Sequence, residues 1–238
     1  MTKHGTTDKS PTLTCAFRFP AETVAFLTDL RTHNDKAWFD ANRARYESAY
    51  VESATAFVEV IGPELKKLVP GIRVEPRVGG SIFRINRDIR FSADKRPYKD
   101  HLDFWFWEGD RKSAVSALFL RVWPDGVVVG VGAHDFDKYQ LATYRDAVVD
   151  PTAGAELATI VNQLEAAGHE IGGETYKRTP RGYAADGVGE RLLRHSALYA
   201  HAELPPKTAT STRFVETVLG HWRTFVGVHR WLVANVQQ

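Results

Sequence analysis

Apolar residues in the N-terminal third of the chain recur at steps of three and four, the spacing of helices with one buried face. Pro20 suits the start of a first helix, and Asn34 with Asp35 offers the N-cap of a second. A third helical pattern follows, in which the Gly-Pro pair at residues 62–63 predicts a kink or a restart. The pattern ends near residues 69–71.

The middle of the chain has the alternation that is typical of strands. We expect strands at residues 81–85, 102–107, 115–123 and 127–133. The last two flank Pro-Asp-Gly at residues 124–126, which favours a hairpin turn. Parallel strands need longer crossovers than these turns provide, so the pattern predicts an antiparallel meander.

The helical period returns after Phe136, with helices expected at residues 138–149 and 153–167. A short edge strand at 171–176, a helical turn at 190–193 and a long final helix at 211–235 follow. No repeat or linker divides the chain. The prediction is a single α+β domain over residues 17–238, with a mostly antiparallel sheet packed by N- and C-terminal helices. Residues 1–16 are expected to be a disordered polar tail.

Composition narrows the class of protein. The 238 residues are 43% hydrophobic and 25% charged, ordinary values for a soluble domain. The single cysteine excludes an intrachain disulfide framework and fits a reducing, cytoplasmic location. No stretch approaches the roughly 18 apolar residues of a membrane helix, so no membrane association is expected. The net charge of +2 is low for a dedicated nucleic-acid domain.

Charge is concentrated in one segment, residues 81–101. Six cations stand there against three carboxylates, an excess of three positive charges in a chain whose total is +2. The cations are Arg84, Arg87, Arg90, Lys95, Arg96 and Lys99, and the carboxylates are Asp88, Asp94 and Asp100. Such a density predicts an anion-binding surface. A second basic segment at residues 177–183 carries three more cations.

Ligand contacts are predicted for cations of both basic segments, because guanidinium and ammonium groups suit phosphate and carboxylate. The predicted set is Arg84, Arg87, Arg90, Lys95, Lys99, Arg178 and Arg181. His101 and Asp88 are the candidate acid–base groups, although a salt-bridged histidine is the commoner case. Alternatively, Asp88 and Asp94 pair with arginines and lock a loop. Three carboxylates do not neutralise all six cations.

Other motifs add little. His134-Asp135 is similar to the dyad of metal-dependent phosphohydrolases, but further His and Asp residues at suitable spacing are not found. The chain lacks a P-loop, a nucleophile elbow, H-E-x-x-H and paired C-x-x-C motifs, so no metal site is predicted and the cofactor is unknown. Trp105 and Trp107 alternate on one strand face, where they are either core residues or a stacking platform.

Residues 83–99, F-R-I-N-R-D-I-R-F-S-A-D-K-R-P-Y-K, resemble the signature of a conserved hypothetical family of bacteria and fungi, domain of unknown function 2461. The hairpin at 124–132 and K-R-T-P-R-G-Y at 177–183 are similar to further segments of that family. His33 and Asp100 depart from its pattern, which has asparagine and threonine there. The resemblance spans about residues 17–199. It implies a single domain and a basic stretch, and it implies no activity.

Three functions fit these observations. The first is an enzyme or enzyme-like site for a phosphorylated or otherwise anionic small molecule, since chemistry needs fixed cations together with carboxylates. The second is a module that binds nucleic acid or an acidic partner protein through cations interleaved with aromatic residues. The third is a purely structural network of arginine and aspartate. The sequence defines neither the reaction nor the oligomeric state.

Overall fold

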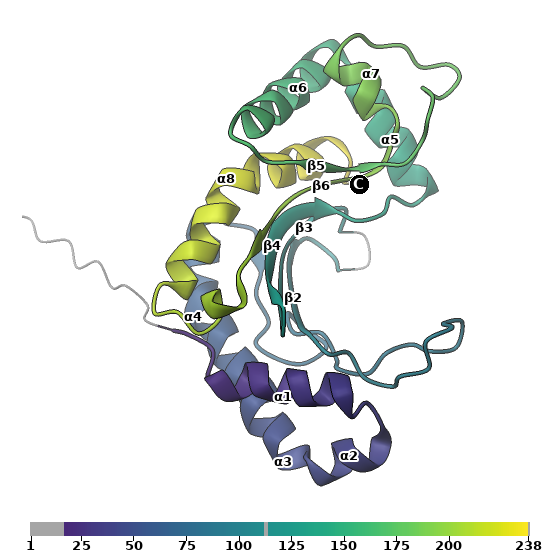
Figure 1. Cartoon of the computed structure of the whole chain (residues 1–238). Coiled ribbons are helices and arrows are strands. Elements are labelled where there is room, and N and C mark those ends of the chain that lie inside the picture. Colours follow the sequence, from purple (N-terminus) through teal and green to yellow (C-terminus); the bar gives the residue numbers. More distant parts are fainter. Residues whose placement is uncertain (1–16, 112–113, 238) are drawn as a thin grey trace, which may run out of the picture.

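The computed structural model describes residues 17–111 and 114–237. One curved sheet lies at its centre, with helices against one side and around both ends (Figure 1). The α+β prediction is confirmed. The tail predicted at residues 1–16 lies outside the described part of the chain.

The N-terminal helices are α1 (Ala21–Thr32), α2 (Lys36–Ala41), α3 (Arg43–Arg45), the π-helix η1 (Tyr46–Glu52) and α4 (Ser53–Leu68). Asp35 caps α2 as predicted, because its carboxylate accepts a hydrogen bond from the backbone N–H of Trp38 at 2.9 Å. Of the kink or restart predicted at residues 62–63, the restart does not occur, because α4 continues through Pro63. Phe57 and Leu65, on either side of Pro63, are both fully buried and hold the two halves against the same core.

The sheet has six strands in the order β1-β2-β3-β4-β6-β5, and every neighbouring pair is antiparallel. The strands are β1 (Ile72–Arg73), β2 (Leu102–Glu108), β3 (Ala117–Trp123), β4 (Gly126–Ala133), β5 (Ile171–Glu174) and β6 (His195–Leu204). The predicted β3–β4 hairpin is confirmed, with Trp123 opposite Gly126. Residues 81–85 form no strand, but they run beside β2, where the Phe83 N–H donates to the Asp103 carbonyl at 3.0 Å.

The remaining helices are α5 (Lys138–Val149), α6 (Pro151–Ala166), α7 (Val188–Leu192), the 3-10 turn η2 (Pro206–Thr208) and α8 (Phe214–Asn235). Asp137 and Asp150 cap α5 and α6. Strand β6 was not predicted from the sequence, although it lies between β4 and β5. Its sheet positions that face the core include Ala200 and Ala202, and alanine gives a weak strand signal because it favours helices.

One face of the sheet forms the core against α4 and α8 (Figure 1). Phe104 meets Phe57 of α4, and Phe106 meets Trp222 of α8, at ring-centre distances of 4.8 and 5.7 Å. The Trp222 Nε1–H donates to the Gly130 carbonyl at 3.0 Å. The buried indole N–H of Trp222 is therefore satisfied where helix and sheet meet.

A polar cluster also lies buried between α8 and the sheet. The His229 ring, fully buried, has Nδ1 2.9 Å from the Ser116 hydroxyl and Nε2 3.0 Å from a Glu108 carboxylate oxygen. Both ring nitrogens thus have partners.

The two edges of the sheet are short and irregular. Strand β1 has two residues, and β5 has four with a bulge between Gly172 and Glu174. Gly173 has a φ of 116°, which glycine adopts without strain. Among the described helices, none has the length and apolar character to cross a bilayer.

Candidate functional site

The second face of the sheet is open between α1–α3 at one end and α5–α7 at the other (Figure 1). Because side chains alternate along strands, the register places defined rows on this face. One row contains Asp103 of β2, Arg121 of β3 and Val128 of β4. The next row along the strands is Trp105, Phe119, Gly130 and His201. The third is Trp107, Ala117, Gly132 and Tyr199.

A cavity of about 350 Å³ opens over the first two rows. Its lining combines aromatic rings with three polar side chains. The lining residues are Phe83, Asp103, Phe104, Trp105, Phe119, Leu120, Arg121, Val128 and His134. The volume lies at the lower end of the range for small-molecule pockets, which are mostly apolar with a few placed polar groups.

Glycines in β4 lie beneath the open face. A Cβ on Gly130 would lie 2.5 Å from the Phe119 ring and 2.6 Å from the Ala200 carbonyl oxygen. The ring of Phe119 therefore lies across β4 where any other residue would displace it. A glycine inside a strand often marks such a close approach, and the Phe119 contact is of that kind.

Asp103 is the charged centre of the cavity wall. Its side chain is 15% exposed, and its two oxygens accept from Arg121 Nε at 2.7 Å and Nη2 at 3.1 Å. His101 Nε2 lies 3.2 Å from the same carboxylate. Burial alone would raise the pKa of Asp103, but hydrogen bonds from His101 and Arg121 outweigh it and lower the pKa to about 2. Asp103 is therefore an anion at neutral pH.

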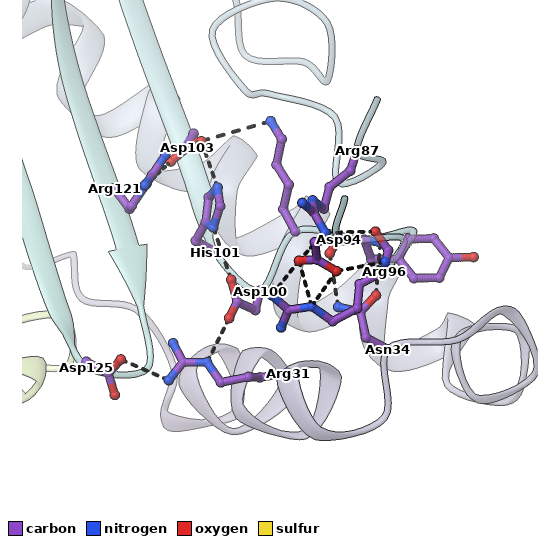
Figure 2. A network of polar contacts seen from close by, with 12 residues as sticks. Arg31, Asn34, Arg87, Asp94, Arg96, Asp100, His101, Asp103, Arg121 and Asp125 are labelled. Atoms are coloured by element: carbon purple, nitrogen blue, oxygen red, sulfur yellow. Dashed lines mark hydrogen bonds and ion pairs between the residues drawn. The ribbon is translucent and has the colours of Figure 1, made fainter. Parts of the chain in front are cut away.

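The pair continues as a chain of polar contacts away from the cavity (Figure 2). His101 Nδ1 lies 3.2 Å from Asp100, which accepts from Arg31 Nε at 2.7 Å. Arg31 Nη1 then donates to Asp125 in the β3–β4 turn at 2.9 Å. The chain joins β3, β2, α1 and the hairpin turn, so it fixes the cavity wall to the N-terminal helices.

His101, a predicted acid–base candidate, lies inside this chain. Each of its ring nitrogens faces a carboxylate, from Asp100 and Asp103. Neither nitrogen is directed at the cavity, so the geometry favours a role in orienting Asp103. Asp88, the other acid–base candidate, pairs with Arg90 at 2.7 Å on the exposed 88–96 loop.

Lys99 is the predicted ligand residue that lies against the cavity wall. Its Nζ is 4.0 Å from Asp103 and 4.8 Å from the centre of the Phe83 ring, and its side chain is 21% exposed. Burial lowers the pKa of Lys99, and the charges of Arg121 and Arg84 act in the same direction, while Asp103 opposes them. These four charges therefore form one electrostatic group.

Four of the other cations, Arg87, Arg90, Lys95 and Arg96, contact their own loop. Arg87 pairs with Asp94 at 2.7 Å, as does Arg96. Lys95 donates to the Ile89 carbonyl at 3.0 Å. Asp88 and Asp94 thus pair with arginines, as in the loop-locking alternative. The tip of the loop carries Phe91, which is 95% exposed.

The second basic segment lies at the far end of the open face. Arg178 and Arg181 are exposed in the loop between β5 and α7. Figure 1 shows this loop and the 88–96 loop at opposite ends of the open side of the sheet. The seven predicted ligand residues are therefore not gathered in one place.

His134, at the end of β4, is a cavity residue between two rings. Its ring centre is 4.8 Å from that of Phe119 and 4.8 Å from that of Tyr199. Burial lowers the pKa of His134, as do the charges of Arg121 and His201. Tyr199 and His201 were not predicted as site residues, because the strand that carries them was missed. The alternation of Leu198, Ala200, Ala202 and Leu204 was the available signal.

Trp105 and Trp107 stack at 5.1 Å with 17° between their planes, and Arg111 lies 5.2 and 4.8 Å from the two ring centres. Arg111 also donates to the Gly79 and Gly80 carbonyls at 2.6 Å. The tryptophan faces are thus partly covered by a fixed arginine. Within residues 17–111 and 114–237, no cluster of three or more His, Cys, Asp or Glu side chains is arranged to hold a metal ion.

Fold and site together define a class: an α+β protein with an antiparallel sheet, open on one face, that carries an aromatic cavity beside an ion-pair network. Residues 22–231 match the profile of the family described as conserved hypothetical protein (DUF2461), and the chain belongs to that family. The resemblance carried by residues 83–99 is thereby confirmed. A search of curated proteins gave no match.

Proposed function

We propose that the cavity on the open face binds an anionic small molecule with a flat apolar part, and that it is an enzyme-like site. The observation that carries this proposal is the composition of the cavity wall. The aromatic rings of Phe83, Trp105 and Phe119 line the cavity beside Asp103 and Arg121. Asp103 and Arg121 form an ion pair, which holds both side chains in place. Rings accept a flat apolar body, and cations accept its acid group.

The charges favour an anion. Arg84, Lys99 and Arg121 contribute three positive charges to the group around Asp103, which contributes one negative charge. The local excess is two positive charges. Arg121 uses Nε and Nη2 on Asp103, which leaves Nη1 for a ligand. The Lys99 ammonium group lies 4.0 Å from the same carboxylate.

The predicted ligand residues acquire different roles under this proposal. Arg84 and Lys99 act at the cavity, with Arg121 added to them. Arg87, Arg90 and Lys95 on one loop, and Arg178 and Arg181 on the other, supply a positive field around the open face that draws anions toward it. His101 positions Asp103. A cytoplasmic location is part of the same proposal, since the single cysteine suits a reducing compartment.

A thermal-shift screen with phosphate, nucleotides, sugar phosphates and aromatic carboxylates tests the proposal. A ligand at one hundred times its dissociation constant adds about 2.7 kcal/mol of stability. We expect a shift with at least one anion, reduced by Arg121→Gln and unchanged by the matched control Arg90→Gln. Arg90 is on the exposed loop, where it pairs with Asp88. No shift with any anion, or equal loss in both variants, would contradict the proposal.

A second candidate function follows from the loop tip. Phe91 is 95% exposed, and the Arg90 guanidinium lies 5.8 Å from its ring centre. Arg90 and Arg96, both on this loop, have side chains 75% and 51% exposed. An exposed ring among cations suits single-stranded nucleic acid, in which bases stack and phosphates pair. Binding to short RNA or DNA should then fall steeply with salt and be lost in Phe91→Ser. Binding without a salt dependence would exclude this function.

A further inference from the structure

The cavity has a second polar end, away from the cations. His134 lines the cavity beside Phe119, and Arg121 lies two residues from Phe119 along β3. In the antiparallel register Phe119 lies opposite Gly130 and Ala117 opposite Gly132, so His134, two residues after Gly132, lies beyond Phe119 from Arg121. The aromatic part of the wall therefore separates a cationic end from an imidazole end.

The His134 side chain is exposed to solvent and its ring lies between two aromatic neighbours. Phe119 and Tyr199 lie on either side of the ring, each 4.8 Å away between centres. Neither ring nitrogen has a hydrogen-bond partner within the described residues. A neutral imidazole has one nitrogen that accepts and one that donates.

The protonation state supports this description. Burial, Arg121 and His201 lower the pKa of His134, while Asp103 opposes them. The ring is therefore neutral at pH 7.5, where it accepts a hydrogen bond from a hydroxyl group. A phenolic hydroxyl, with an ordinary pKa near 10, keeps its proton at that pH.

We propose that the ligand of this cavity is a phenolic acid, an aromatic acid whose hydroxyl lies opposite its acid group. The acid group contacts Arg121 and Lys99, the ring lies against Phe119 and Trp105, and the hydroxyl donates to His134. The inference rests on the proposed function and adds the substrate class. A benzene ring with its two groups at opposite ends has the same order of parts as the cavity wall, in which an aromatic section lies between Arg121 and His134, and a phenylpropenoic acid is the longer member of the class.

The test compares acids that differ only in the hydroxyl. Isothermal titration at pH 7.5 measures 4-hydroxybenzoate against benzoate, and 4-hydroxycinnamate against cinnamate. We expect the hydroxyl to increase affinity about three- to tenfold in at least one pair, the contribution of an ordinary hydrogen bond. In His134→Phe, which keeps a ring in place, this gain should vanish while the parent acid still binds. His134→Gln, which retains an acceptor, should keep part of the gain.

His33→Phe is the matched control, because His33 is an exposed histidine at the end of α1 that stacks on Trp38 and does not line the cavity. It should leave the hydroxyl gain unchanged. The inference is overturned if no hydroxylated acid binds more tightly than its parent, or if the gain survives in His134→Phe. In either case an anion response that depends on Arg121 would leave the proposed function intact. If neither these acids nor any other anion binds, both fail together.

Discussion

Asp103→Asn is the most informative perturbation of the site, because it removes one charge with almost no change of shape. The wild-type carboxylate is mostly buried and accepts from Arg121 at 2.7 Å, with His101 at 3.2 Å. An amide in its place keeps one oxygen that accepts from Arg121 but removes the negative charge that Arg121 and His101 face. We expect Asp103→Asn to have a lower free energy of unfolding than the wild type at neutral pH, and the difference between the two proteins to be smaller in acid.

The magnitude follows from the pKa. Lowering the pKa of Asp103 from its ordinary 3.8 to about 2 corresponds to about 2 kcal/mol, since each unit is worth about 1.4 kcal/mol. The folded state holds the ionised form more tightly, so the stabilisation is fully present above the unfolded pKa. It is lost as the pH falls through the folded pKa. About half of it should remain near pH 3.

Urea denaturation of the wild type and Asp103→Asn at pH 7 and pH 3 measures the effect. The difference between the two proteins should shrink by about 1 kcal/mol in acid, whatever constant cost the amide adds. Asp88→Asn, which changes an exposed carboxylate of the 88–96 loop, should leave the midpoint at pH 7 unchanged. A difference for Asp103→Asn that is the same at both pH values would refute the reasoning.

Three further predictions use urea or thermal denaturation. Gly130→Ala should lower the free energy of unfolding by about 1–3 kcal/mol, because the added methyl group overlaps the Phe119 ring. Gly220→Ala, in open space on α8, should raise it by about 0.5–1 kcal/mol. Equal effects of the two substitutions would contradict this. Trp222→Phe should lower the free energy of unfolding by about 2 kcal/mol, because it shrinks a buried ring and removes the N–H that donates to the carbonyls of Phe119 and Gly130. Burial lowers the pKa of His229, so the unfolded state binds a proton at a higher pH than the folded state does. The free energy of unfolding should therefore decrease as the pH drops through about 6.5. In His229→Gln this decrease should be smaller.

Local chemistry in the sequence accounts for most of the fold. The hairpin at Pro124–Gly126 and the caps at Asp35 and Asp137 depend on residues close in the chain, and those elements are predictable. Strand β6 is different, because it pairs with β4 some 70 residues earlier and half of its apolar face is alanine. Its stability comes from neighbours that a local pattern does not contain.

The site is only partly predictable for the same reason. The sequence identifies a basic stretch, and the structure divides it between a loop in which arginines pair with aspartates and Lys99 at the cavity wall. Arg121 reaches Asp103 through strand register, and His134 reaches Phe119 through the β3–β4 pairing. The spacing of residues along the sequence does not determine which residues share a row across a sheet.

The short, irregular edges of the sheet have a practical consequence for these experiments. An edge strand with a long row of unpaired backbone groups is a template for another chain, and it promotes aggregation. Here β1 offers two residues, and the bulge in β5 interrupts the other edge. Substitutions at Arg121 or His134 lie on interior strands or their ends and leave both edges as they are. Variants of the open face should therefore tolerate the high concentrations that titration of weak ligands requires.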